Sequence, residues 1–204
     1  MSSSLVEDRS LLAKCFSGDR EAGEALVRQF SNLVYRAVQQ TFIARHVPHT
    51  REDVEDLHNT VFLHLFEHGC KKLKQYKGKN GCSLATWIRL ITVRTVLDHF
   101  RKKEVAIAIR PKMKIPLDEV YGLKEEGKDV LALLEEAEKK GLIREGMEKL
   151  PPRDRLFMKL HLDQGLSVTE VAAAMKISIE NAHTIKHRAI RKLKAKVALA
   201  VGEM

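Results

Sequence analysis

The sequence predicts an all-α protein of two small helical domains joined by a linker, with a helix-turn-helix in the second domain. Apolar residues recur at three- and four-residue steps along most of the 204 residues, which is the period of amphipathic helices. There is no sustained alternation of apolar and polar residues and no Asn-Gly or Asp-Gly hairpin. Residues 104–128 lack a helical period and contain two prolines and two glycines, so we expect them to be the linker. The two domains are expected at 5–103 and 129–204.

The first domain is expected to contain four helices whose ends are marked by local signals. The residues "SGD" separate the first two helices, and "RHVPHT" interrupts the chain with a proline. Thr50 and Asp53 have the spacing of a capping box, so they start the third helix. A loop rich in lysine and glycine follows, and Ser83 opens the fourth helix. The expected helices are 5–16, 20–42, a third that Thr50 caps and whose apolar run covers 54–66, and 83–103.

The second domain has the punctuation of a helix-turn-helix over about 167–196. Pro151 and Pro152 start a helix, because their missing N–H groups cost nothing in a first turn. "SVTE" at 167–170 is a second capping box, and the turn "KIS" leads from a short helix into a long one. Lys176 stands in this turn, where a glycine usually supplies a left-handed conformation. The long helix has the length and outer polarity that fit the major groove of DNA.

The charge indicates a polyanionic partner. The formal net charge is +9, which favours nucleic acid or, less often, an acidic membrane face. Residues 69–103 carry ten basic and one acidic side chain, and residues 150–204 have a net charge of +5. An acidic span over 117–149, with a net charge of −4, separates them. Two cationic zones predict two contacts with one long polyanion, the alternative being two solubilising faces.

Other features of the sequence exclude several classes of protein. No apolar run approaches the length that spans a membrane, and the N-terminus lacks the pattern of a signal peptide. The three cysteines are odd in number, far apart and without a CxxC pair, so a reduced cytoplasmic protein is expected. There is no phosphate-cradling glycine loop, nucleophile elbow or paired-carboxylate site. We therefore expect neither an enzyme nor a protein that needs a cofactor.

The outer face of the long helix over 177–194 carries the candidate contacts to duplex DNA. Arg188 is expected to read guanine, because its fork matches two acceptors in the major groove. Arg191, Lys192 and Lys194 are expected to contact phosphates. A merely solvated basic helix is the alternative. Smaller contacts are expected from Asn181, His183, Thr184 and His187.

The first domain carries candidate contacts to single-stranded DNA. The loop over 71–82 is expected to be flexible, and its lysines suit the phosphates of an opened strand. Trp87 has core spacing on the fourth helix, although an indole can also stack on a base. Side chains away from the core spacing of this helix can face nucleic acid: Arg89, Thr92, Arg94, Thr95, His99 and Lys102.

Three motifs, in order and correctly spaced, resemble a bacterial RNA polymerase sigma factor of the extracytoplasmic-function (ECF) type. "EDVEDLHNTVFLHLF" resembles the acidic polymerase-docking helix of that family, with Asn59 and Phe66 replacing its usual glutamine and tryptophan. "GKNGCSLATWIRLITVRTVLDHFRKK" resembles the promoter-melting segment, although Val93 and Arg94 stand where the family often has Arg-Asn. "SVTEVAAAMKISIENAHTIKHRAIRKL" matches the C-terminal helix-turn-helix without a gap. The resemblance extends from about Leu11 to Lys196.

The resemblance implies a mechanism and partners. Such a factor binds core RNA polymerase, directs it to promoter DNA, helps to open the duplex, and is often held by an anti-sigma factor. The implied polymerase contacts are Asp53, Glu55, Asp56 and Leu57. The implied contacts to the minus-10 element are Lys77, Lys79, Asn80, Arg89, Thr92, Arg94, Thr95, His99, Arg101 and Lys102. Those to the minus-35 element are Ser178, Asn181, His183, Thr184, His187, Arg188, Arg191 and Lys194.

Three alternative interpretations of the sequence remain open. The acidic residues of the docking motif lie in a first helical turn, where they favour the helix dipole without any partner. A stand-alone helix-turn-helix repressor would use the first domain for effector binding or dimerisation. A metal- or redox-responsive module would use Cys70, Cys82 and the histidines. His64 and His68 are one helical turn apart and precede Cys70, but no second cluster completes four ligands, so no metal is expected.

Overall fold

The computed structural model describes residues 3–78, 82–108 and 141–202, and every regular element within these ranges is an α-helix. The predicted all-α class is confirmed. The chain divides into two compact units, Met1–Arg110 and Pro111–Met204. Among the described residues, no helix combines the length and the apolarity that crossing a membrane requires.

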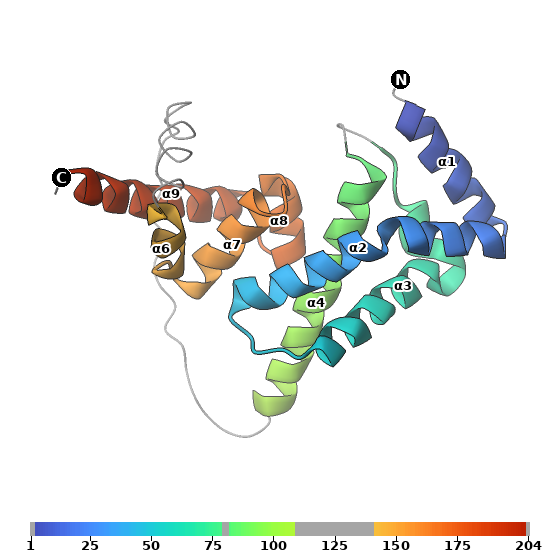
Figure 1. Cartoon of the computed structure of the whole chain (residues 1–204), viewed down its shortest axis with the longest axis horizontal. Coiled ribbons are helices and arrows are strands. Elements are labelled where there is room, and N and C mark those ends of the chain that lie inside the picture. Colours follow the sequence, from blue (N-terminus) through green and yellow to red (C-terminus); the bar gives the residue numbers. More distant parts are fainter. Residues whose placement is uncertain (1–2, 79–81, 109–140, 203–204) are drawn as a thin grey trace. The chain divides into compact units, whose positions relative to one another are not determined.

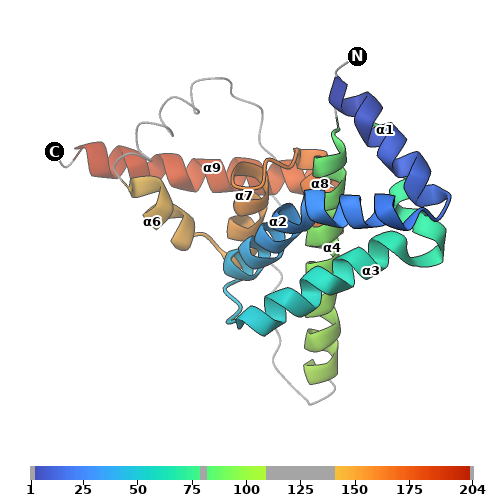
Figure 2. The same cartoon turned by 45° about the vertical axis from the view of Figure 1, so that its right-hand side comes forward.

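Four helices form the first unit, and α2 is at its centre (Figures 1 and 2). Helix α2 packs against α1, α3 and α4, and α4 also packs against α3. The side chains of Leu26, Val34, Leu65, Leu84 and Ile88 are completely buried between these helices. The helices are α1 (Ser3–Phe16), α2 (Arg20–Arg45), α3 (Arg51–Lys74) and α4 (Leu84–Ala108).

The predicted starts of α3 and α4 are confirmed by their capping hydrogen bonds. The Thr50 side chain accepts from the backbone N–H of Asp53 at 3.1 Å, and the Asp53 carboxylate accepts from the backbone N–H of Thr50 at 2.8 Å. These reciprocal bonds satisfy donors that a first turn leaves without helical partners. The Ser83 hydroxyl accepts from the backbone N–H of Thr86 at 3.1 Å.

The segment after α3 differs from the predicted loop. Glu67 is extended, His68, Gly69 and Cys70 are left-handed with φ of 52°, 65° and 61°, and a further helical turn ends at Lys74. Cys70 and Leu73 are buried, so this turn is anchored to the unit. The expectation of a flexible loop is therefore wrong for residues 71–74. Lys79 and Asn80 lie outside the described residues.

The end of α4 differs from the predicted boundary between the first domain and the linker. Helix α4 continues to Ala108, five residues beyond the predicted end at 103. Residues 109–128 of the expected linker lie outside the described residues, and so do residues 129–140 of the expected second domain.

The second unit is built on one long helix, α9, against which three shorter helices pack (Figure 1). Phe157, Leu160, Leu166, Ile185 and Leu193 form its centre, each at most 1% exposed. The elements are α6 (Leu142–Glu148), α7 (Pro152–Leu162), α8 (Val168–Met175) and α9 (Ile179–Gly202).

The predicted helix-turn-helix is present as α8, a tight turn and α9. Ser167 and Glu170 form the predicted capping box at the start of α8. Lys176 ends this helix with φ of 57° and ψ of 49°, which is the left-handed conformation that a glycine adopts more easily. The turn that the sequence predicts therefore forms without its usual residue.

Candidate nucleic-acid interface

Helix α9 has one fully buried stripe and one polar outer face, as its periodicity predicts. Ala182, Ile185, Ala189 and Leu193 are at most 1% exposed and face the three shorter helices. His183, Arg191, Lys192 and Lys194 are exposed, and Thr184 and His187 are half-buried. The exposed cations lie in the second half of the described outer face, where they suit phosphate contacts.

Two polar residues at the start of α9 are engaged within the helix. The Ser178 hydroxyl accepts from the backbone N–H of Asn181 at 3.2 Å, so it caps the first turn. The Thr184 hydroxyl donates to the carbonyl oxygen of Glu180 at 2.9 Å. Both residues lie near the outer face, but the Ser178 oxygen and the Thr184 hydroxyl proton are each engaged by a local partner.

The position of Arg188 corrects the expectation that its fork is free to read guanine. Its Nε donates to Asp154 Oδ2 at 2.8 Å, and its Nη2 donates to the other carboxylate oxygen. Asp154 lies in the first turn of α7 and is completely buried, and the Arg188 side chain is only 33% exposed. Residue 188 precedes the buried Ala189 and flanks the buried stripe, so its side chain reaches α7 rather than solvent.

Two threonines predicted to face nucleic acid from α4 are buried instead. Thr92 has no exposed surface and donates its hydroxyl to the carbonyl oxygen of Ile88 at 2.9 Å. Thr95 is 8% exposed, and its hydroxyl lies 3.5 Å from Nδ1 of His64. Because α2 and α3 both pack against α4, a wider arc of the helix is covered than one amphipathic stripe predicts. Both assignments to the minus-10 element are therefore withdrawn.

The other candidates on α4 keep access to solvent to different degrees. Arg94 and Lys102 are exposed, and Arg89, His99 and Arg101 are half-buried. Arg101 forms an ion pair with Asp98 one turn earlier. Burial and the nearby Lys103 ammonium lower the pKa of His99 below its ordinary value of 6.5. Lys77, in the segment before this helix, is exposed.

The acidic motif at the start of α3 is only partly available to a partner. Leu57 is 4% exposed and belongs to the core, so its expected contact with polymerase is corrected. The Asp53 carboxylate is held in the capping box, and hydrogen bonds from Thr50 lower its pKa. Glu55 pairs with Arg51 at 2.6 Å, whereas Asp56 is exposed. The alternative of a local helix-start role therefore applies best to Asp53.

An exposed stripe on α3 contains residues that the sequence reasoning did not assign to a site. Glu52, Asp56, Asn59 and Leu63 follow one another at steps of four, three and four residues, and all four are exposed. Leu63 is 66% exposed, the largest value among the large apolar side chains of the described residues. An apolar residue out of phase with the core stripe of Val54, Leu57, Val61 and Leu65 is the sequence signal for it.

The described residues contain no group of three metal-ligating side chains that could hold an ion. Burial, and then the charge of Lys72, lower the pKa of His64, whose ring lies against Thr95. Cys70 is buried and His68 is exposed. The three residues whose spacing resembles part of a metal site thus have different surroundings.

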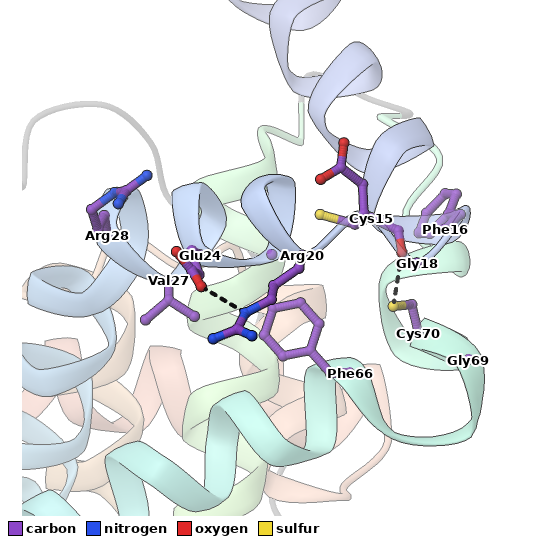
Figure 3. Close-up of a pocket in the computed structure, with 12 residues that line it drawn as sticks. Cys15, Phe16, Gly18, Arg20, Glu24, Val27, Arg28, Phe66, Gly69 and Cys70 are labelled. Atoms are coloured by element: carbon purple, nitrogen blue, oxygen red, sulfur yellow. Dashed lines mark hydrogen bonds and ion pairs between the residues drawn. The ribbon is translucent and has the colours of Figure 1, made fainter.

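A pocket of about 740 Å³ lies between α1, α2 and the end of α3 (Figure 3). Two of its four charged lining residues, Arg20 and Glu24, pair with each other at 3.1 Å. The Cys70 thiol points to the carbonyl oxygen of Cys15 at 3.8 Å. The pocket contains none of the residues predicted to bind DNA or polymerase, so it is separate from the candidate interface.

Comparison with solved structures finds similar chains at low identity. A chain described as CnrH in complex with the cytosolic domain of CnrY is 20% identical, with a TM-score of 0.49 and coverage of 94% of this chain and 97% of that one. The sigma factor RpoE in complex with the anti-sigma factor NepR, from Bartonella quintana, is 13% identical, with a TM-score of 0.49 and coverage of 86% and 98%. A chain of the RsbN–BldN complex is 20% identical, with a TM-score of 0.33 and coverage of 90% and 96%. No curated protein matches the chain.

Two family models match the chain on the two units described above. Sigma-70 region 2 matches residues 26–105, which include most of α2 and all of α3. Sigma-70 region 4 matches residues 146–195, which include the helix-turn-helix. The regions occur in the order that the sequence motifs predict, and each overlaps one of the two cationic zones. This chain therefore belongs to the sigma-70 family of transcription initiation factors, which bind core RNA polymerase and promoter DNA.

Proposed function

We propose that this sigma factor reads the minus-35 element with the outer face of α9 and docks on core polymerase through the exposed stripe of α3. The observation that carries the proposal is the division of α9 into a buried stripe and an outer face on which His183, Arg191 and Lys194 are exposed. A helix presented in this way by a helix-turn-helix has the geometry for major-groove binding.

On α9, the outer face offers two kinds of contact. Arg191 and Lys194 are exposed cations one turn apart, so they favour phosphates and set the register. His183 and His187 are one turn apart nearer the start of the helix, where side chains meet base edges. Asn181 and Thr184 flank them. Arg188 is not assigned a base contact, because its fork is engaged with Asp154.

For the minus-10 element we propose the segment before α4 together with the solvent-accessible cations of that helix. Lys77, Arg94 and Lys102 are exposed, and Arg89, His99 and Arg101 are accessible in part. Lys79 and Asn80 retain this role from the sequence alone. Cations and planar side chains suit the phosphates and bases of an opening strand. Replacing Lys77, Lys79 and Asn80 with alanine should reduce strand separation, followed by permanganate reactivity, more than closed-complex binding.

For polymerase docking we propose the stripe of Glu52, Asp56, Asn59 and Leu63, which replaces Leu57 of the original assignment. An exposed leucine framed by acidic and amide side chains is typical of an apolar contact with a polar rim. The assignment also keeps Asp56 and removes the need for a buried residue to reach a partner.

The remaining features are proposed from the family. The chain acts by binding, without a reaction of its own, in the cytoplasm, and it is organised as a region 2 domain over 5–103, a linker and a region 4 domain over 129–204. An anti-sigma factor is proposed as a further partner. CnrH and RpoE, at the low similarity given above, have been solved with the cytosolic domain of CnrY and with NepR.

The docking proposal is tested with surface variants that leave the core intact. Asp56→Ala combined with Leu63→Ala should weaken binding to core polymerase by roughly tenfold or more, measured by competition with the parent chain. Glu21→Ala, an exposed acid at the start of α2, is the matched control and should bind like the parent. Unchanged affinity of the double variant would refute the assignment of this stripe.

The repressor alternative is distinguished by what the protein needs in order to act. A sigma factor should give run-off transcription from its promoter only when core polymerase is present, and Arg191→Ala should reduce the transcript. A stand-alone repressor would bind duplex DNA tightly without polymerase and would not support transcription by the core enzyme.

A further inference from the structure

The ion pair between Arg188 and Asp154 joins α9, the second helix of the helix-turn-helix, to α7, which lies outside that motif. Two parallel hydrogen bonds, from Nε and Nη2 of Arg188, engage both carboxylate oxygens of Asp154. The residues are 34 positions apart, one in α9 and the other in the first turn of α7. A bidentate pair fixes the relative orientation of two planar groups, which a lysine or a single hydrogen bond does not.

The burial of the pair makes it difficult to exchange for a contact with DNA. Asp154 has no exposed surface, so its charge depends on Arg188 for compensation. If Arg188 swung outward to a guanine, it would leave an uncompensated buried carboxylate, which is strongly destabilising. The geometry therefore favours a pair that persists when DNA is bound.

The residues of the buried stripe of α9 contribute unequally to defining the rotation of the helix, because Ile185 and Leu193 are large and the other two are small. Two of its four residues, Ala182 and Ala189, are alanines, which provide little side chain to interlock with neighbours. Arg188 is adjacent to His187, four residues after Thr184 and three before Arg191. A rotation that broke the bidentate geometry would therefore move each of these outer side chains relative to the groove.

We propose that the Asp154–Arg188 pair is a positioning device that fixes the rotation of α9 and thereby sets which base preferences the outer face expresses. Arg188 is then a positioning residue, and Asp154 determines specificity without touching DNA. The inference rests on the proposed function of α9 as the reader of the minus-35 element. A buried ion pair often stabilises a fold no more than well-packed apolar residues of the same volume would. A role in orienting α9, rather than in stability, agrees with this.

The test measures base preference rather than affinity alone. The full chain is assembled with core polymerase, and holoenzymes select from duplex fragments randomised over the upstream element. The variants are Asp154→Asn, Arg188→Lys, Arg188→Ala and the double variant Asp154→Asn/Arg188→Ala. Arg191→Ala, an exposed cation three residues further along α9, is the matched control. Circular dichroism identifies the variants that fold. If Asp154→Asn does not fold, Arg188→Lys still tests the pair, because it keeps the positive charge but not the bidentate geometry.

We expect Asp154→Asn and Arg188→Lys to change preferences at several base positions in the same pattern, each by roughly five- to tenfold. The double variant should be no worse than the more affected single variant, because the two residues act as one unit. Arg191→Ala should weaken all sequences alike and lower the dependence of binding on salt.

Three outcomes would overturn the inference. If Arg188→Ala flattens one base position and Asp154→Asn changes none, Arg188 reads a base directly. If the folded variants keep the preferences of the parent, the pair is structural only. If the parent holoenzyme itself shows no preference at the upstream element, the proposed function of α9 fails, and the inference fails with it; in the other two cases only the inference fails.

Discussion

The indole of Trp87 donates a hydrogen bond from Nε1 to the main-chain carbonyl oxygen of Lys72, at 3.1 Å. Trp87 lies in the first turn of α4, and Lys72 lies in the short helical turn that follows the left-handed residues of α3. The indole is half-buried. The bond therefore connects the end of α3 to α4, the helix that carries most of the minus-10 candidates. Because the indole is half-buried, the prediction that Trp87 belongs to the core applies to only part of its ring.

Trp87→Phe should lower the free energy of unfolding by about 1 kcal/mol, because it keeps an aromatic ring but removes this hydrogen bond. Urea unfolding followed by circular dichroism provides the measurement. Since a phenyl ring can still stack on a base, promoter opening by the folded variant separates the two roles. An unfolding free energy equal to that of the parent would show that the hydrogen bond does not stabilise the unit.

Two helical glycines, one buried and one half-buried, predict opposite effects of alanine. A Cβ at Gly146 in α6 would lie 2.8 Å from Cδ2 of the buried Leu193, so Gly146→Ala should destabilise the second unit by about 1–3 kcal/mol through overpacking. Gly23 in α2 has its nearest such neighbour, Cε1 of Phe66, at 3.9 Å. Gly23→Ala should instead stabilise the first unit by about 0.5–1 kcal/mol through helix propensity. Thermal unfolding of both variants tests the contrast, which fails if the signs agree.

Two histidines predict a dependence of stability on pH. Burial, as the largest cause, lowers the pKa of His64 and of His99 below the ordinary value of 6.5. The unfolded chain therefore takes up protons at a pH where the folded chain does not, so stability is full above about pH 6.5 and falls as the pH decreases toward the folded pKa values. In urea unfolding between pH 5 and pH 7.5, His64→Gln combined with His99→Gln should show a smaller decrease than the parent. Equal decreases would exclude these histidines as its source.

Lys176 predicts a stabilising substitution. Its φ of 57° lies in the left-handed region, where a non-glycine residue loses about 1–2 kcal/mol relative to the right-handed helix. Lys176→Gly should therefore raise the free energy of unfolding by roughly 0.5–1 kcal/mol, since glycine also loses more backbone entropy on folding. Lys186→Gly, in the right-handed interior of α9, is the matched control and should lower the free energy of unfolding by about 1 kcal/mol. A loss of stability in Lys176→Gly would contradict the prediction.

The features that the sequence predicts correctly are decided by residues close together in the chain. The capping boxes of Thr50 with Asp53 and of Ser167 with Glu170 depend on residues three positions apart, and both form. The buried stripe of α9 also follows from helical period alone, because one side of that helix is covered. Periodicity is sufficient where a helix has a single buried face.

The features that it predicts incorrectly depend on contacts between distant residues. Thr92 and Thr95 are buried because two helices cover α4, which its own sequence does not reveal. Arg188 points to α7 because Asp154, far away in the chain, offers a buried carboxylate. The left-handed residues after α3 are also missed, since only one of His68, Gly69 and Cys70 is a glycine.

Because the left-handed residues His68, Gly69 and Cys70 interrupt the helix, we expect the end of α3 to unfold locally and separately from the rest of α3. The helical hydrogen bonds of residues 51–66 stop at the extended Glu67, so the turn that ends at Lys74 can lose its structure without disturbing them. The burial of Cys70 and Leu73 opposes backbone strain at His68 and Cys70. The amides of this turn should therefore exchange with deuterium through a fluctuation smaller than global unfolding, while those of α2 exchange only when the unit unfolds. We therefore expect this turn, with Lys71, Lys72 and Lys74, to rearrange while the rest of the unit remains folded.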